Sequence, residues 1–213
     1  MTTLILVRHG QSEANETHAF AGHYDAPLTD LGYRQAEAAA NYIQSHYTPS
    51  KVYASDLSRA YNTGKTIAEK LNIPIVKNEK LREIMAGDWE GKKLSFLQCE
   101  YAHDYNMWLT DIGNAACTNG EKIADLAKRV HGALVTIAEE NPSGTVVIAT
   151  HATPVRAMLT LVQKGNLNYM KDIPWAPNAS ISVLQYEDGK WNFTLVGSEE
   201  HLEGIKSEIP PNV

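Results

Sequence analysis

Two histidines and two arginines are the residues of this chain best suited to chemistry on a phosphate group. Arg8 and His9 follow the apolar run 4–7, and His151 follows the apolar run 146–149 after Thr150. Arg59 comes shortly after the short run 51–54. Arginine offers a planar, permanently charged fork that matches phosphate oxygens. A neutral imidazole nitrogen can attack phosphorus when its other nitrogen is held by an acceptor. Together these residues predict a site for a tetrahedral dianion.

The two histidines are expected to have different catalytic roles. We expect His9 to be the nucleophile and His151 to be kept protonated by the bound dianion, so that it donates hydrogen bonds to the phosphoryl group. The transition state of phosphoryl transfer spreads charge over its equatorial oxygens, so fixed cations aimed at them supply most of the catalysis. Arg8 and Arg59 are the expected fixed cations.

Such a site also needs a proton donor for the leaving alkoxide. Glu83 follows the expected third strand at the entrance of an irregular region, and it is the candidate general acid. Its pKa would have to be raised in the pocket for it to hold a proton near neutral pH. The alternative interpretation of Glu83 is a solvated glutamate at a loop entrance.

A metal ion is the competing use for two histidines. Arginines beside them would repel a cation, and no paired carboxylates stand at ligand spacing, so no metal is expected there. His18 and His23, five residues apart in an expected loop, are a weaker alternative as a surface metal site. We therefore predict chemistry without a metal or other cofactor.

Strands that alternate with helices must position these residues. Thr29 is the expected N-cap of the first long helix. Strands are predicted at 4–7, 51–54, 74–76, 145–150, 180–186 and 190–196, and helices at 30–46, 57–71, 94–103, 121–140 and 154–163. The strand 4–7 and the centre of the strand 145–150, at 146–149, are continuously apolar, as in strands buried on both faces of a parallel sheet.

This pattern predicts a three-layer α/β/α sandwich with a mostly parallel central sheet, an antiparallel edge element and a small cap insertion at about 84–120. One domain over residues 1–213 is expected from the length. Ligands of open α/β sheets bind beyond the carboxyl ends of the strands. That rule brings Arg8, His9, Arg59 and His151 to one edge. Gly10 is expected to permit a close approach of the backbone to the ligand.

The composition and net charge of the chain limit the kinds of partner that it is expected to bind. The chain is 43% hydrophobic and 21% charged, with a formal charge of −6 and two cysteines. The negative charge argues against nucleic-acid binding, because phosphate neutralisation needs a basic face. No apolar stretch is long enough to cross a bilayer, and no secretory signal or disulfide framework is indicated. We expect a cytoplasmic protein whose partner is a small phosphorylated metabolite; the sequence predicts no oligomeric state.

Several blocks, in order along nearly the whole chain, resemble the histidine phosphatase superfamily, also called the phosphoglycerate-mutase-like family. They are residues 6–15, 25–36, 55–60, 81–91 and 150–151. The resemblance implies that His9 is phosphorylated, that Arg8, Arg59 and His151 clamp the phosphoryl group, and that Glu83 is the proton donor. It also implies that Asn15 lines the phosphate pocket. Ala152 departs from the family pattern, since glycine is usual after the second histidine.

The resemblance leaves the acceptor of the phosphoryl group open. In a phosphatase water receives it, whereas in a phosphoglycerate mutase a second substrate hydroxyl does. Mutases of the family carry a longer insertion with extra basic residues, and this chain offers only Lys92 and Lys93 as cations between Glu83 and Gly120. A phosphomonoester hydrolase is therefore favoured over a mutase. A non-catalytic phospho-ligand binding module is the alternative of another class.

Overall fold

A six-stranded sheet forms the centre of the computed structural model, which describes residues 1–208. Its strand order is β4-β3-β6-β1-β7-β8. The strands are β1 Thr2–Arg8, β3 Val52–Ala54, β4 Ile75–Lys77, β6 Thr145–Thr150, β7 Ile181–Glu187 and β8 Lys190–Ser198. Strands β4, β3, β6 and β1 are parallel, while β7 pairs antiparallel with β1 and β8 with β7. The predicted parallel sheet with an antiparallel edge element is confirmed.

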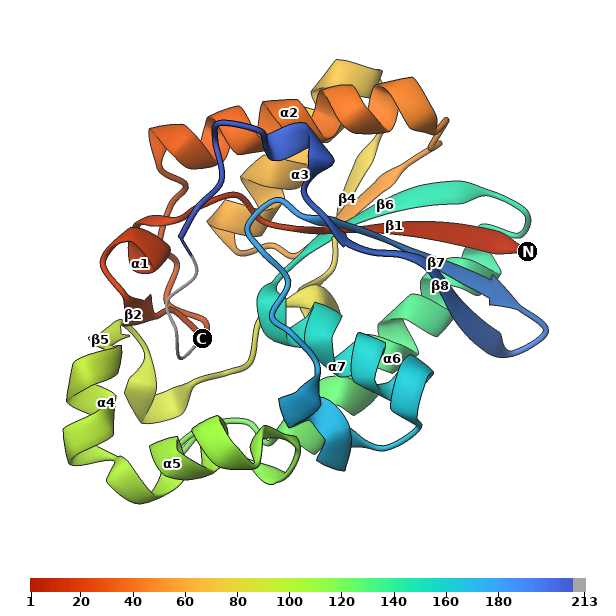
Figure 1. The fold of residues 1–213 in the computed structure, drawn as a ribbon. Coiled ribbons are helices and arrows are strands. Elements are labelled where there is room, and N and C mark those ends of the chain that lie inside the picture. The colour runs from red at the N-terminus through yellow and green to blue at the C-terminus, as the bar shows by residue number, and fades with distance from the viewer. Residues whose placement is uncertain (209–213) are drawn as a thin grey trace.

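Helices cover both faces of this sheet, as Figure 1 shows. Helices α2 and α3 lie on one face, and α6 and α7 lie on the other. The α-helices are α1 Glu13–Glu16, α2 Asp30–His46, α3 Ser58–Leu71, α4 Leu94–Glu100, α5 Ala102–Thr110, α6 Ile123–Glu140 and α7 Ala152–Lys164. Short 3-10 turns are η1 Glu79–Leu81, η2 Gly87–Trp89, η3 Ile112–Asn114, η4 Leu167–Asp172 and η5 Glu200–Leu202. The predicted three-layer sandwich is confirmed.

The two central strands are the most buried part of the chain. Residues 4–7 of β1 and 146–149 of β6 are at most 2% exposed. Side chains alternate across a strand, so each strand feeds the apolar layers on both faces of the sheet. Ile5 and Val147 pack toward α2 and α3, whereas Leu6 and Ile148 pack toward α6 and α7. This rigid pair of strands carries Arg8 and His151 at its ends.

The start of α2 determines the shape of the loop after His9. Thr29 caps the helix as expected, because its hydroxyl accepts a hydrogen bond from the N–H of Gly32. A Cβ on Gly10 would lie 2.3 Å from the carbonyl oxygen of Gly32. The structure thus gives Gly10 a packing role, and the expected approach of its backbone to a ligand stays a prediction. The backbone that comes close to Gly10 belongs to the first turn of α2, and this packing is what requires a glycine.

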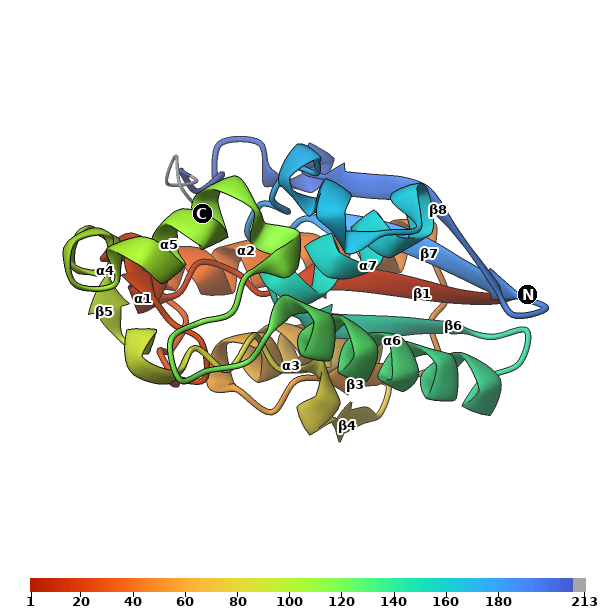
Figure 2. The same cartoon turned by 90° about the horizontal axis from the view of Figure 1, so that it is seen from below.

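The cap region contains two helices where one was predicted at 94–103. Helix α4 ends at Tyr101, whose backbone leaves the helical region at φ −121° and ψ 35°, and α5 follows at once. The two-stranded sheet of β2 Ala19–Phe20 and β5 Lys92–Lys93 joins this cap to the segment after α1. Figure 2 shows α4 and α5 beyond the carboxyl ends of β1 and β6. The cap thus lies beside the edge where the chemistry-bearing residues gather.

Candidate active site

The ends of three neighbouring parallel strands meet at the candidate site. Arg8 ends β1 and lies in register with Thr150 at the end of β6, so His9 and His151 follow at the same level. Ser55 follows β3, the other neighbour of β6, and α3 begins three residues later with Arg59 in its first turn. The structure therefore brings together the four residues that the sequence predicted at this edge.

The rings of His9 and His151 contact each other. Their centroids are 5.2 Å apart, and the planes cross at 63°. The Nδ1 of His9 lies 2.7 Å from the carbonyl oxygen of Gly10. A carbonyl can only accept, so Nδ1 carries the proton and Nε2 keeps its lone pair. Burial, then Arg59 and Arg8, hold the pKa of His9 well below its usual range. His9 is therefore a neutral imidazole with one free nitrogen near neutral pH.

His151 has one satisfied and one open ring nitrogen. Its Nε2 lies 2.8 Å from the hydroxyl oxygen of Ser55. Its Nδ1 is buried and has no hydrogen-bond partner among the described residues. Burial, followed by the charge of Arg59, holds the pKa of His151 well below its usual range as well. A bound dianion would both supply a partner for a ring nitrogen and favour the protonated ring.

Arg8 and Arg59 are buried cations anchored by backbone carbonyls. Arg8 donates from Nη1 to the carbonyl of Ala176 at 2.6 Å. Arg59 donates to the carbonyls of Gly22 at 2.8 Å and Tyr24 at 3.1 Å. The Nε of each arginine is buried without a partner in the described chain. Burial lowers the pKa of Arg8 to about 10, so it keeps its charge at neutral pH. Both guanidinium groups thus have unused donors.

Glu83 is held at the site by its side chain and its backbone. Its two carboxyl oxygens accept from the N–H groups of Ile84 at 2.8 Å and Thr153 at 3.2 Å. Its carbonyl accepts from Arg129 at 2.7 Å and from Nε2 of His23 at 3.0 Å. The residue as a whole is 9% exposed. The interpretation of Glu83 as a solvated loop residue is therefore wrong, because the residue is buried and its carboxyl oxygens accept hydrogen bonds from backbone N–H groups at the site.

The side chain of Asn15 is oriented by its neighbours. Its Oδ1 accepts from the N–H and the hydroxyl of Ser12, each at 3.0 Å, and from Nδ2 of Asn178 at 3.1 Å. With the oxygen occupied, the amide nitrogen is the group that Asn15 can offer a ligand. Asn178 also donates to the carbonyl of His9 at 3.2 Å. Asn178 was not predicted, because it stands in a loop without periodicity far along the chain.

A cavity of about 60 Å³ opens at this site. Four of the six predicted site residues line it, namely Arg8, His9, Asn15 and Glu83. Arg59 and His151 do not line it. They are 1% and 0% exposed, and each contacts a residue of the lining, Arg59 the carbonyl of Gly22 and His151 the ring of His9. The six residues therefore form two layers, with His9 in the layer that reaches the cavity.

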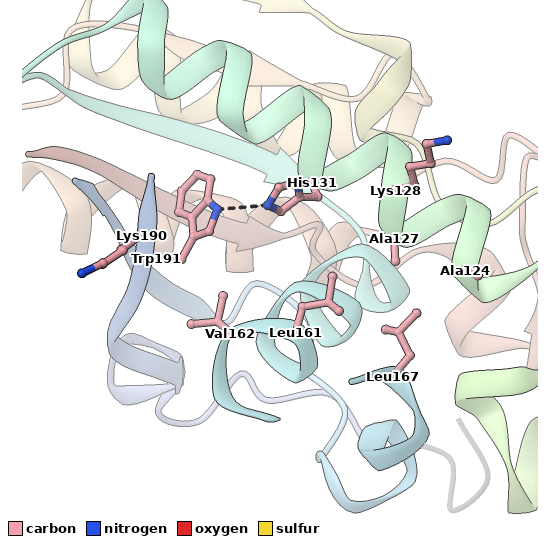
Figure 3. A pocket seen from close by; sticks show the side chains of 9 residues that line it. All are labelled: Ala124, Ala127, Lys128, His131, Leu161, Val162, Leu167, Lys190 and Trp191. Atoms are coloured by element: carbon pink, nitrogen blue, oxygen red, sulfur yellow. Dashed lines mark hydrogen bonds between the residues drawn. The ribbon is translucent and has the colours of Figure 1, made fainter. Parts of the chain in front are cut away.

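A larger groove, of about 690 Å³, lies elsewhere, between α6, α7 and β8 (Figure 3). Its floor includes Leu161 and Val162, and its histidine, His131, accepts at Nε2 a hydrogen bond of 3.2 Å from Trp191. It contains no carboxylate, and Lys128 and Lys190 extend from it at opposite ends. Size alone would select this groove, but the groups able to act on a phosphate lie in the smaller cavity.

The described residues contain no group of three or more histidine, cysteine, aspartate or glutamate side chains arranged to hold a metal ion. Nor does any described helix have the length and apolar character needed to span a membrane.

Known proteins resemble the chain in sequence and in structure. A family model, histidine phosphatase superfamily (branch 1), matches residues 4–199. Phosphoserine phosphatase 1 of Hydrogenobacter thermophilus is 30% identical over 215 residues, covering 97% of this chain and 100% of the relative. Bacillus stearothermophilus YhfR has a TM-score of 0.90 at 26% identity, covering 95% of this chain and 100% of that one. A mycobacterial glucosyl-3-phosphoglycerate phosphatase in complex with VO3 has a TM-score of 0.85 at 25% identity, covering 92% and 99%.

The α/β fold and its phosphatase relatives define an enzyme that hydrolyses phosphomonoesters. The chain belongs to the histidine phosphatase superfamily (branch 1). The family expected from the sequence is thereby confirmed.

Proposed function

We propose that this enzyme hydrolyses monoesters of small phosphorylated metabolites through a phosphohistidine on His9, without a metal ion. The observation that carries the proposal is the state of His9. Its Nδ1–H is fixed on the Gly10 carbonyl, its ring is neutral, and it lines the cavity beside Arg8. An imidazole held in this way has the nucleophilic nitrogen that phosphoryl transfer requires.

The reaction would run in two steps. Nε2 of His9 attacks phosphorus, the bond from phosphorus to the ester oxygen breaks, and the departing alkoxide takes a proton from Glu83. A water oxygen then attacks phosphorus, Glu83 takes one proton from the water, and the bond from phosphorus to Nε2 breaks, which releases inorganic phosphate and restores the neutral ring of His9. Arg8 and Arg59 would hold the oxygens of the phosphoryl group through their open donors, His151 through a ring nitrogen and Asn15 through its amide nitrogen.

Water is the proposed acceptor of the phosphoryl group. A mutase must also bind the carboxylate of its acceptor, which requires a cation beside the cavity. Lys92 is the partly buried lysine of the cap. Its Nζ donates to the hydroxyl of Tyr101 at 2.8 Å and lies 4.8 Å from the centre of that ring. Lys93 is exposed. Neither lysine lines the cavity.

The small metabolite as substrate is supported by the relatives named for phosphoserine and glucosyl-3-phosphoglycerate. We also propose one domain with a cap at about 84–120, because Leu97 and Trp108 of the cap belong to the same core cluster as Leu6 and Ile148. A cytoplasmic location is proposed from the free thiols of Cys99 and Cys117.

Trapping the intermediate tests the mechanism. After brief incubation with an aryl phosphate and acid-free quenching, mass spectrometry should find one phosphoryl group on His9. His9→Ala should lower turnover by about 10⁴-fold or more while the melting temperature stays within a few degrees. A chelator should leave the rate unchanged. Appreciable turnover by His9→Ala would exclude the nucleophile, and strong inhibition by the chelator would exclude the metal-free reaction.

A further inference from the structure

The wall of the cavity that faces the phosphate-binding residues is aromatic and carries no charge. We infer that the alcohol released by this enzyme is uncharged and apolar, an aromatic alcohol in the first place, and that Trp175, positioned by Arg156, sets this preference. The inference rests on the proposed function of the same site and names the class of substrate.

Apart from the four predicted site residues, the cavity has no ionisable side chain in its lining. The large members of this wall are Phe20 of β2, Leu94 of α4, Trp108 of α5 and Trp175 in the loop before β7. Three alanines and Gly22 fill the gaps, and Thr153 supplies the one hydroxyl. Arg8 and Glu83, the charged residues of the lining, are used on the phosphoryl group and the ester oxygen.

The rings of this wall support one another. Phe20 meets Trp108 edge to face, with centroids 5.1 Å apart at 74°. Trp108 and Trp175 lie nearly parallel, with centroids 6.1 Å apart at 23°. Such arrangements stabilise aromatic pairs and restrict their rotation. The three rings come from separate parts of the chain, so the wall is a consequence of tertiary packing.

Arg156 fixes Trp175 without presenting its charge to the cavity. Its guanidinium carbon lies 4.1 Å from the centre of the Trp175 ring, a cation–π contact. Its Nε donates to the carbonyl of Ile173 at 2.7 Å, two residues before Trp175. Arg156 is 7% exposed and does not line the active-site cavity. Its positive charge is therefore used to hold the ring and its loop.

The same loop holds the catalytic residues. The carbonyl of Ala176 accepts from Arg8, and Asn178 donates to the carbonyl of His9. Trp175 stands directly before Ala176, so the position of its ring is coupled to the position of the phosphate-binding residues. The wall and the phosphate site are thus one unit, and the wall meets the first atoms of any alcohol attached to the phosphate.

Charged alcohols fit this arrangement poorly. In phosphoserine a carboxylate and an ammonium group sit on the second carbon from the ester oxygen, so both would lie against the lining of the cavity of about 60 Å³. There neither charge would find a partner, and burying an unpaired charge is strongly unfavourable. An uncharged aromatic alcohol would instead gain contact with Trp108 and Trp175.

A comparison of substrates tests this without any variant. We expect kcat/KM for benzyl phosphate to exceed that for phosphoserine by at least about tenfold, a difference of about 1.4 kcal/mol. A second pair is 4-methylphenyl and 4-carboxyphenyl phosphate. The carboxylate makes the phenol a better leaving group, so slower hydrolysis of the 4-carboxyphenyl ester would report exclusion of the charge.

Variants of Trp175 and Arg156 test whether these residues set the preference for an aromatic alcohol. Trp175→Ala should lower the ratio of kcat/KM for benzyl phosphate over phosphoserine by about tenfold, mainly through KM, and Trp175→Phe should restore part of it. Arg156→Met should lower the same ratio, and Arg156→Lys should recover part of the loss. A merely structural role of Arg156 would lower both substrates equally. Trp191→Phe, in the remote groove, is the matched control and should leave the ratio unchanged.

The possible outcomes distinguish a failure of the aromatic-alcohol inference from a failure of the proposed phosphatase function. If phosphoserine is preferred while the phosphoryl group is still trapped on His9, the aromatic-alcohol inference is wrong and the phosphatase mechanism stands. An unchanged ratio in Trp175→Ala and Trp175→Phe would likewise overturn the role of Trp175. If no monoester is hydrolysed and His9 carries no phosphate, the proposed function fails, and the inference fails with it.

Discussion

His9 and His151 lie edge to face, with ring centroids 5.2 Å apart, and both residues are buried, at 4% and 0% exposed. Two imidazolium ions at this separation, beside Arg8 and Arg59, would repel each other strongly. The site is therefore built from neutral rings, and a bound dianion is what would make a protonated ring favourable. The close contact of two neutral rings therefore predicts how the stability of the protein and its affinity for a phosphate-like anion depend on pH.

The lowered pKa values of the two histidines predict a loss of stability in mild acid. The unfolded chain binds protons near pH 6.5 while the folded rings stay neutral, so the free energy of unfolding falls as pH drops below about 6.5. His201, with its pKa also lowered by burial, adds to the slope. Melting temperatures measured between pH 7.5 and 5 should fall, and His9→Gln should flatten the curve. A melting temperature that rises toward pH 5 would contradict the neutral rings.

The effect of vanadate on the melting temperature tests whether binding of an anion protonates His151. As a phosphate-like anion it should raise the melting temperature more at pH 5.5 than at pH 7.5, because it favours the protonated ring of His151. Equal shifts at both pH values would show that no ring takes up a proton when the anion binds.

Glu83→Gln separates general-acid catalysis from binding. An alkyl phosphate releases a strongly basic alkoxide, so its kcat should fall by about 10²–10⁴-fold. For 4-nitrophenyl phosphate, whose leaving group needs no proton, the loss should stay below about tenfold. Steady-state rates with the two esters provide the measurement. Equal losses on both would remove Glu83 from the role of proton donor.

Much of this site could be predicted from the sequence, because parallel strands end at one edge of a sheet. The apolar runs before His9 and His151 located two strand ends, and the pairing of β1 with β6 brought them together. Glu83 was harder, since it follows a short strand and its place depends on N–H groups from distant segments, such as that of Thr153.

The aromatic wall could not be predicted in the same way. Trp175 and Asn178 stand in an irregular loop, and they reach the site through tertiary contacts. Trp175 stacks on Trp108 of the cap, and Asn178 donates to the carbonyl of His9, 169 positions away. No periodicity marks such contacts. The break at Tyr101 between α4 and α5 was missed for a related reason, because tertiary packing of the cap decides where that helix ends.

Gly10 and Gly132 form a matched pair for testing the close packing behind His9. A Cβ on Gly10 would lie 2.3 Å from the Gly32 oxygen, whereas a Cβ on Gly132, within α6, meets nothing within 4 Å. Gly10→Ala should destabilise the protein by about 1–3 kcal/mol and lower activity, because the loop carrying His9 must move. Gly132→Ala should stabilise it by about 0.5–1 kcal/mol. Denaturant unfolding measures both, and a neutral Gly10→Ala would contradict the close approach.

Ser55→Ala tests how the second histidine is positioned. The Ser55 hydroxyl is the one hydrogen-bond partner of the His151 ring among the described residues, so its removal leaves a buried ring with two open nitrogens. An unsatisfied buried polar group costs about 1–3 kcal/mol, and a ring free to rotate would stabilise the transition state less well. We expect kcat to fall by about 10–100-fold and vanadate affinity to weaken in parallel. Ser58→Ala, three residues on, is the control, because the buried Ser58 hydroxyl has no hydrogen-bond partner within residues 1–208 and its loss should change neither quantity. If Ser55→Ala keeps full activity while both variants remain folded, His151 does not depend on Ser55 for its orientation.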